Sequence, residues 1–373
     1  MSDSKVDTSK FKIGLGRHLL DGMMTGAPTF WRLLGQLESM VLSEQLEDVR
    51  ITKPVYVTGL ARSGTTILLE VLAGHNDVVC HRYSDFPGLF TPYWWGQANQ
   101  HADSELQERA HGDGLMVSQK SPEAMEEVLW MAHFGQLHDT ASKSVLDKTA
   151  NNPAFEKEYR EHIRKLLLLR NGERYVAKGN YNLARMEYIL KIFPDAKFVI
   201  PVRHPVDHIA SLVKQHELFY QGQQEHPRSR AHLKRVGHFE FGLDRCPINF
   251  GDQDLIDEIV NDWQTEHSVR GWSKYWAMVY AWVDRQISQN ASLASQVKFV
   301  RYEDLCSQSE STLESVLQFA DLYDANVVES WSGKLKAPNY YEPKFNSDDL
   351  STIREHCSEV AQRYGYQSDS WRF

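Results

Sequence analysis

The residues with the clearest chemical potential form a loop at positions 59–66, with the sequence GLARSGTT. The segment PVYVTG at 54–59 predicts a short buried strand that leads into this loop, and helical periodicity resumes at 67–73 after it. Two glycines allow a tight turn with exposed backbone N–H groups, and the following helix adds the positive end of its dipole. Arg62 contributes a permanent charge within the loop. The pattern predicts a binding site for a dianionic group such as phosphate.

The same loop argues against an ordinary nucleotide kinase or NTPase. A Walker A loop places a lysine directly after its second glycine. Here that position is Thr65, and the basic residue has moved inside the loop. Thr65 and Thr66 offer hydroxyl donors instead. A kinase or NTPase, a non-catalytic nucleotide-binding module and a purely structural turn remain the alternative interpretations of this segment.

A second segment, residues 193–212, carries a further set of phosphate-binding side chains. A predicted buried strand ends at Arg203, and Pro205 suits the first turn of the helix that follows. Asp207 lies in that turn, where negative charge is favoured, and Ser211 lies near the same helical face. The alternative is structural, with Arg203 capping the strand through an ion pair to Asp207.

Both segments resemble the nucleotide-binding motifs of sulfotransferases that use 3′-phosphoadenosine 5′-phosphosulfate (PAPS). The first is similar to the family's 5′-phosphosulfate loop, P-K/R-S/G-G-T-T, with Ala61 where proline is usual. The second is similar to the 3′-phosphate motif, with His204 replacing Asp or Asn. A third segment, VKFVRYEDL at 297–305, resembles the family's late strand. The resemblance implies that PAPS is bound by Arg62, Ser63, Gly64, Thr65, Thr66, Arg203, Ser211 and Tyr302.

Tyr302 would lie near the adenosine in this interpretation, because a phenol ring can stack on a base. A buried core tyrosine is the alternative. The resemblance covers roughly residues 53–85 and 175–320, and it is closest to the bacterial, tyrosylprotein and carbohydrate branches of the family. It therefore implies a carbohydrate or a small hydroxylated molecule as the sulfuryl acceptor.

Sulfuryl transfer is an in-line displacement that needs positive charge at the leaving oxygen and does not require a metal. Arg62 and the loop supply part of this charge, and a lysine is expected to supplement it. Lys178 follows a predicted strand at 175–177 and resembles the lysine that precedes the family's second motif. Lys148 is the alternative, because it resembles a lysine of the carbohydrate branch.

A general base must remove the proton of the acceptor hydroxyl. The related branches use a glutamate just beyond the second strand, and Asp85 is the nearest carboxylate in that region. His81 is a second candidate because imidazole titrates near neutrality, and a residue elsewhere is a third. The phenol and steroid branches use a histidine from another segment, and Asn182 stands at its approximate place here.

Three further clusters have both a structural and a functional interpretation. Ser121, Pro122 and Glu123 predict a helix start, with Glu123 at the acceptor pocket as the alternative. The aromatic run YWW at 93–95 could stack on an acceptor ring or pack a segment onto the domain. His204 and His208 have the spacing of metal ligands, but no third ligand matches them, so we expect no metal.

The order of elements predicts the fold class. Strands are expected near 54–59, 78–80, 175–177, 198–200 and 297–300, and helices between them. This alternation predicts an α/β fold in which a P-loop-like parallel sheet is flanked by helices, with helical insertions. We expect a single domain over 1–373, with a helical preface at 1–50 and probable insertions or a lid at 86–147 and 221–270.

The preface contains an apolar stripe at helical spacing. Phe30, Leu33, Leu34, Leu37 and Val41 predict a helix that packs on the main domain. A membrane-surface helix is the alternative, and it is disfavoured because the polar face of the segment is not basic.

Composition limits the remaining possibilities. The 373 residues are 42% hydrophobic and 24% charged, as expected of a globular protein with a core. A net charge of −9 disfavours a nucleic-acid partner but still permits a local anion site. Four widely spaced cysteines predict reduced thiols. Neither a signal-peptide pattern nor an 18-residue apolar stretch is present, so we expect a cytoplasmic protein without a transmembrane segment.

Overall fold

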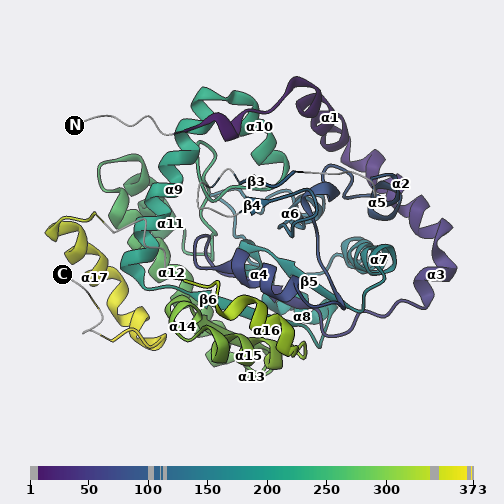
Figure 1. The fold of residues 1–373 in the computed structure, drawn as a ribbon. Coiled ribbons are helices and arrows are strands. Elements are labelled where there is room, and N and C mark those ends of the chain that lie inside the picture. The colour runs from purple at the N-terminus through teal and green to yellow at the C-terminus, as the bar shows by residue number, and fades with distance from the viewer. Residues whose placement is uncertain are drawn as a thin grey trace.

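The computed structural model describes residues 7–99, 105–109, 111, 116–336, 344–367 and 371. At its centre lies a five-stranded sheet in the order β2-β5-β1-β6-β7, in which all neighbours are parallel (Figure 1). The strands are β1 (Val55–Val57), β2 (Val78–Val79), β5 (Arg174–Lys178), β6 (Lys197–Val202) and β7 (Val297–Arg301). The predicted α/β class with a parallel sheet and flanking helices is confirmed.

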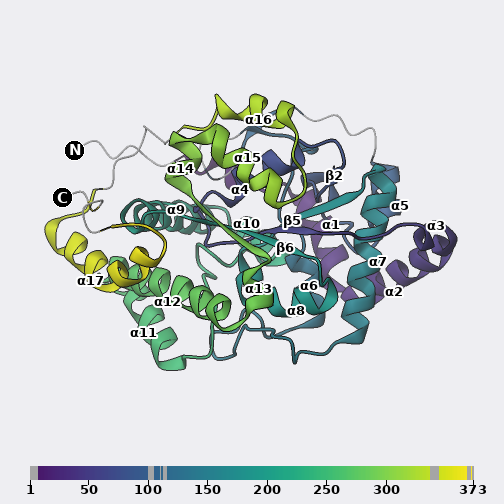
Figure 2. The same cartoon turned by 90° about the horizontal axis from the view of Figure 1, so that it is seen from below.

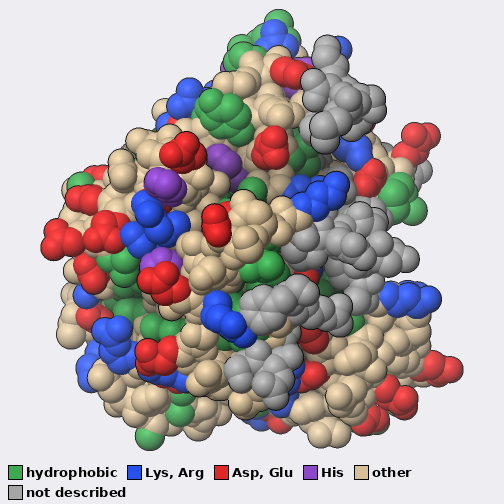
Figure 3. Space-filling model, turned by 90° about the vertical axis from the view of Figure 1, so that its left-hand side faces the viewer, with side chains coloured by type: hydrophobic (Ala, Val, Ile, Leu, Met, Phe, Trp, Pro, Cys, Tyr) green, Lys and Arg blue, Asp and Glu red, His purple; other side chains and the backbone are tan. Residues whose placement is uncertain are grey.

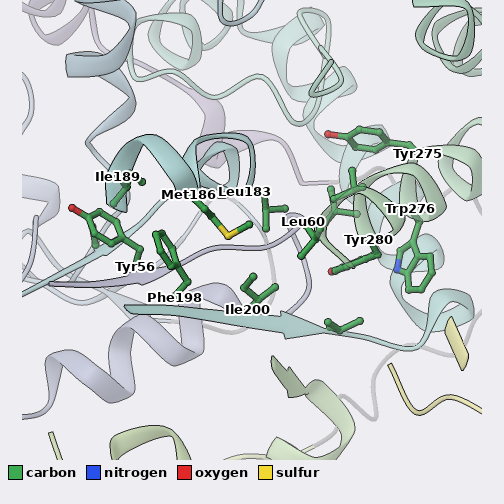
Figure 4. Packing of buried hydrophobic residues seen from close by; sticks show 14 of the residues in the cluster. Tyr56, Leu60, Leu183, Met186, Ile189, Phe198, Ile200, Tyr275, Trp276 and Tyr280 are labelled. Atoms are coloured by element: carbon green, nitrogen blue, oxygen red, sulfur yellow. The ribbon is translucent and has the colours of Figure 1, made fainter. Parts of the chain in front are cut away.

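Helices cover both faces of the sheet, as parallel strands require for their crossover connections. Figure 2 shows α4, α15 and α16 on one side and α8 and α12 on the other. Alternate strand residues serve the two layers: Val55 and Val57 pack with α4, whereas Tyr56 stacks on Phe198 at 5.7 Å between ring centroids (Figure 4). The helices of these layers are α4 (Thr65–Ala73), α7 (Pro153–Arg170), α8 (Met186–Ile192), α9 (Pro205–Glu225), α12 (Ser268–Gln289), α15 (Ser309–Phe319) and α16 (Ala325–Ser332).

The two predicted insertions contain short regular elements. The first carries α5 (Pro92–Ala98), the antiparallel pair β3 (Gln107–Glu108) and β4 (Met116–Val117), and α6 (Glu127–His133). The helix predicted to start at Ser121 is wrong, because Pro122 forms a bridge with Arg82 and the N–H of Glu123 donates to the His81 carbonyl. The second insertion and the remaining described chain contribute α10 (Pro227–Arg235), α11 (Gln253–Gln264), α13 (Ala291–Ala294), α14 (Tyr302–Ser307) and α17 (Ser347–Arg363).

The N-terminal helices differ from the prediction in the face that they bury. The chain forms α1 (Leu15–Gly26), α2 (Pro28–Val41) and α3 (Ser43–Glu47) at the rim of the molecule (Figure 1). The expectation that α2 packs through its apolar stripe is wrong, since Phe30, Leu33 and Leu37 are exposed. The helix buries Gly35 instead, where an added Cβ would lie 2.3 Å from the carbonyl oxygen of Phe90. Only a glycine permits this close approach, and it fixes which face turns inward.

Among the described helices, no segment has both the length and the apolar character needed to cross a bilayer.

Candidate active site

The loop after β1 forms a tight turn. Gly64 has a φ of 109° and Arg62 a φ of 71°, so both lie in the left-handed region and the chain reverses into α4. The Ser63 hydroxyl donates to the Leu60 carbonyl at 2.7 Å, which ties the turn from inside. Ser63 is fully buried, so its side chain stabilises the loop from inside. The side chain of Arg62 and the start of α4 with Thr65 and Thr66 face the cavity described below.

A histidine on α9 holds this loop in place. The indole N–H of Trp276 donates to Nδ1 of His208 at 3.1 Å, which leaves the proton on Nε2. Nε2 then donates to the carbonyl oxygen of Ala61 at 2.8 Å. Burial lowers the pKa of His208 to about 3, so the ring is neutral at physiological pH. His208 is therefore a brace for the loop, and the described residues contain no group of three potential metal ligands.

The two predicted nucleotide motifs meet in space. Nε of Arg62 donates to the Ser211 hydroxyl at 3.2 Å, which joins the loop to α9. Arg203, directly after β6, lies with its guanidinium 4.8 Å from the ring centroid of Tyr302. The same ring touches the loop, because a Cβ at Gly64 would lie 2.8 Å from Tyr302 Cδ2. Three segments distant in sequence thus surround one point at the carboxyl ends of β1, β6 and β7.

A cavity of about 430 Å³ opens beside the loop. One wall is polar and carries cations next to the loop: Arg62, Arg109 and Lys178. Lys178 is the last residue of β5 and pairs in register with Val57, so it lies where the loop begins. The cavity also has apolar lining residues, which include Phe11, Ile13, Phe86, Met125, Phe219 and Leu233.

A glutamate faces the lysine across the polar wall. Oε1 of Glu123 lies 3.9 Å from Nζ of Lys178, and the Glu123 side chain is 17% exposed. Burial alone would raise the pKa of Glu123, but the charge of Lys178 and hydrogen bonds from Tyr83 and the Ala124 N–H outweigh it and lower the pKa. The carboxylate is therefore ionised at neutral pH and can accept a proton from a group bound in the cavity.

A second buried glutamate, Glu126, also lines the cavity. Tyr159 and Tyr175 both donate to Oε1 of Glu126, while Oε2 has no hydrogen-bond partner. Burial raises the pKa of Glu126 to about 7, and the tyrosine hydrogen bonds offset this only in part. The group therefore titrates near neutrality, although its position inside a tyrosine cluster separates it from the cationic wall.

The other predicted base candidates lie elsewhere. Asp85 forms an ion pair with Arg170 at 2.6 Å and accepts a hydrogen bond from the backbone N–H of Arg82. It lines a smaller, separate cavity. Both carboxylate oxygens of Asp85 are therefore engaged in contacts that stabilise the local structure. His81 is buried against His162, with 2.8 Å between their Nε2 atoms, and burial lowers its pKa to about 3. Neither side chain lines the cavity that contains Arg62 and Lys178.

The structure also separates the remaining alternatives. Lys148 is exposed and outside the cavity, whereas Lys178 and Asn182 line it. None of the aromatic residues at 93–95 lines the cavity; Trp94 is exposed, and the Trp95 indole N–H donates to the Ser84 carbonyl. Arg109 was missed by sequence reasoning, and its Nη1 lies 3.3 Å from Thr66 Oγ1. No pattern around Arg109 marks it, because only folding of the insertion brings it to the loop.

The parallel sheet and the glycine-containing turn that leads into a helix define a P-loop-like fold of the α/β class. Comparison with known proteins narrows this class. The model of the sulfotransferase family matches residues 54–245, slightly more than half of the sequence. The chain belongs to the sulfotransferase family.

Individual relatives support this membership. The chain is 23% identical over 369 residues to the omega-hydroxy-beta-dihydromenaquinone-9 sulfotransferase Stf3 of Mycobacterium bovis and of Mycobacterium tuberculosis, over 89% of this chain and 80% of the relative. Sulfotransferase STF1 of M. tuberculosis H37Rv superimposes with a TM-score of 0.50 at 16% identity, over 92% of this chain and 85% of that one. Sulfotransferase STF9 of Mycobacterium avium gives 0.52 at 12% identity, over 87% and 81%. These solved structures share the fold.

Proposed function

We propose that this chain transfers the sulfuryl group of PAPS to the hydroxyl of a small, largely apolar acceptor, by in-line displacement and without a metal. The observation that carries the proposal is the contact between Arg62 and Ser211, which joins the two segments that resemble the 5′-phosphosulfate and 3′-phosphate motifs. Arg203 and Tyr302 extend the same cluster. Such a cluster suits a nucleotide with phosphate groups at two positions.

In this proposal the residues divide the chemistry between them. Arg62, the loop amides and the hydroxyls of Thr65 and Thr66 stabilise the negative charge that builds on the bridging oxygen as its bond to sulfur breaks. Lys178 neutralises the sulfuryl oxygens from the end of β5. As the acceptor oxygen bonds to sulfur, its proton passes to the carboxylate of Glu123.

The role of Glu123 depends on its neighbour. In the free chain, the charge of Lys178 helps to lower the pKa of Glu123. A sulfuryl group bound beside Lys178 would share that charge, and the pKa of Glu123 would then rise toward the range of an effective base. Glu123 replaces Asp85 in our proposal because Glu123 lines the cavity and Asp85 does not.

The acceptor is proposed from the apolar part of the cavity lining. Phe11, Ile13, Phe86 and Phe219 present hydrocarbon and aromatic surface to the cavity. Such a wall favours an apolar molecule over a carbohydrate, whose many hydroxyls would lose their hydrogen bonds to water. The relative Stf3 is named for a hydroxylated menaquinone, which agrees with this class of acceptor.

Two measurements test the proposal. Thermal-shift titration should show stabilisation by 3′-phosphoadenosine 5′-phosphate and little by ATP with Mg²⁺; a preference for ATP would contradict it. Incubation with radiolabelled PAPS should then label hydroxylated isoprenoid quinones or long-chain alcohols more than monosaccharides. Labelling of sugars alone would keep the sulfotransferase assignment and reject the apolar acceptor.

A further inference from the structure

The first two long helices carry an outward-facing apolar surface. Nine of the fifteen exposed large hydrophobic side chains among the described residues lie on α1 and α2. They reach 58% exposure at Leu33 and 66% at Met40. We call this set the α1–α2 apolar face; it consists of Leu15, Leu19, Leu20, Met23, Phe30, Leu33, Leu37, Met40 and Val41. An apolar surface of this extent on one edge usually marks an interaction site.

Polar anchors hold the helices in this orientation. Lys165 of α7 pairs with the buried Glu38 at 3.0 Å and donates to the Gly35 carbonyl at 2.7 Å. Arg32 forms a bidentate ion pair with Glu158, in which Nε and Nη2 each lie 3.0 Å from a carboxylate oxygen. The apolar side of α2 cannot turn inward without breaking these buried contacts, so its exposure is built into the fold.

Exposed basic side chains lie near α1, and exposed acidic side chains follow α2 on α3. Between residues 8 and 42 the two acidic side chains, Asp21 and Glu38, are fully buried, whereas Lys12 is exposed. Two further cations of this segment are paired, Lys10 with Glu108 and Arg17 with Asp21. The chain as a whole carries a net charge of −9, so this basic edge is a local feature. On the side that carries α11 and α17, by contrast, acidic and basic side chains are interspersed (Figure 3).

A basic helix lies beside α1 and widens this edge. A Cβ at Gly22 would lie 3.0 Å from Nη2 of Arg235, and Arg235 donates to the His18 carbonyl at 3.1 Å. Residues 226–239, which include α10, contain four Lys and Arg residues and no Asp or Glu. Arg228 is exposed there, while Arg230 and Lys234 share Asp244.

The face is continuous with the cavity of the proposed active site. Lys10, Phe11, Ile13 and Arg17 line that cavity, and they belong to the segment that leads into α1. An apolar molecule that moves from a lipid phase past α1 would therefore reach the lining of the cavity.

We infer that the α1–α2 apolar face docks on the surface of an anionic lipid bilayer, with the cavity opening toward it. Apolar side chains would enter the boundary between headgroups and acyl chains, and Lys12 and the cations of α10 would contact the headgroups. The idea that an apolar acceptor enters the cavity from the bilayer rests on the proposed function, whereas the docking itself is independent of it. The competing occupant is a second copy of the chain, since the exposed Glu44 and Glu47 of α3 could face the basic edge in an antiparallel pair. A symmetric contact centred on α1 would instead bring like charges together, which favours the bilayer.

Co-sedimentation of the full chain with vesicles tests the inference. Binding is expected to vesicles of phosphatidylcholine mixed with phosphatidylglycerol, and to be much weaker with phosphatidylcholine alone. A triple variant, Leu33→Ser, Leu37→Ser and Met40→Ser, should lower vesicle binding by roughly tenfold or more. Lys12→Glu with Arg228→Glu should do the same at low salt. Tyr323→Ser, an exposed aromatic away from this face, is the matched control and should bind as wild type.

Nucleotide affinity separates this inference from the proposed function. All of these variants should bind 3′-phosphoadenosine 5′-phosphate as the wild type does, because none of them lines the cavity. Absence of vesicle binding in the wild type would overturn the docking whatever the enzyme activity. A wild-type dimer that light scattering shows to become monomeric in the triple variant, with vesicle binding unchanged, would assign the face to a second copy.

Discussion

Arg62 and Ser211 are 149 positions apart in the chain and meet through a 3.2 Å hydrogen bond from Nε to Oγ. The contact connects the turn after β1 with the second helical turn after β6, and these two strands are neighbours in the sheet. Because both strands are parallel, their carboxyl ends lie at the same edge and the segments that follow them converge. The nucleotide site that we propose depends on this convergence.

Removal of either arginine should weaken nucleotide binding. We expect Arg62→Ala and Arg203→Ala each to lower the affinity for 3′-phosphoadenosine 5′-phosphate by roughly 10- to 100-fold, as loss of a hydrogen bond to a charged group predicts. Isothermal titration calorimetry measures this directly. Ser211→Ala is the milder control, because it removes a neutral partner and leaves both charges. Near-wild-type affinity in both arginine variants would refute the proposed site.

Substitution of Glu123 should separate binding from turnover. Glu123→Gln keeps the shape of the side chain and should lower kcat by roughly 10²- to 10⁴-fold, the usual contribution of a general base, with nucleotide affinity nearly unchanged. Asp85→Asn should instead reduce stability, by about 3 kcal/mol, because it leaves Arg170 partly buried without its partner. Loss of turnover in Asp85→Asn, with normal stability and nucleotide affinity, would return the role of base to Asp85.

The pH profile of kcat/KM provides an independent check on Glu123. Its pKa in the free chain is lowered, so the carboxylate remains ionised through neutral pH. The acid limb of the profile should therefore lie below the usual carboxyl range, because kcat/KM reports the free enzyme. A limb near neutral pH would instead indicate a histidine or Glu126 as the base.

Stability should depend on the ionisation of Glu126. Its pKa is about 7 in the folded chain and near 4.5 when exposed, so the folded state holds the proton more tightly. The stabilisation from this proton is complete below pH 4.5 and is lost as the pH rises through 7. Between pH 5.5 and 8.5 the melting temperature should fall by roughly 2–4 °C more in the wild type than in Glu126→Gln. Parallel curves for the two proteins would contradict the raised pKa.

The brace on the loop should affect affinity without touching the ligand. His208→Leu removes the hydrogen bond to the Ala61 carbonyl and should weaken nucleotide binding by roughly fivefold to tenfold, about 1 kcal/mol. Trp276→Phe removes only the bond that fixes the tautomer of His208, so its effect should be smaller. Calorimetry on both variants tests this order, and an unchanged affinity in His208→Leu would show that the loop holds its shape alone.

Much of this molecule follows from its sequence. Alternating strand and helix patterns predicted the parallel sheet, because fully buried strands such as β6 are continuous apolar runs. Helix α7 begins at Pro153 with Asn152 as its N-cap, and both residues are local start signals in the sequence. The loop at 59–66 was recognisable because glycines and a helix start are local properties of the chain.

Tertiary structure decided the features that depend on contacts between distant segments. Asp85 and Glu123 are both carboxylates near an apolar neighbour, and only folding shows that Arg170 engages the first while the second faces Lys178. The apolar stripe of α2 predicted a buried face, yet the close approach at Gly35 and the Glu38–Lys165 pair turn it outward. The periodicity of a sequence predicts that a helix has an apolar and a polar face. Which face becomes buried is determined by the surface on which the helix packs.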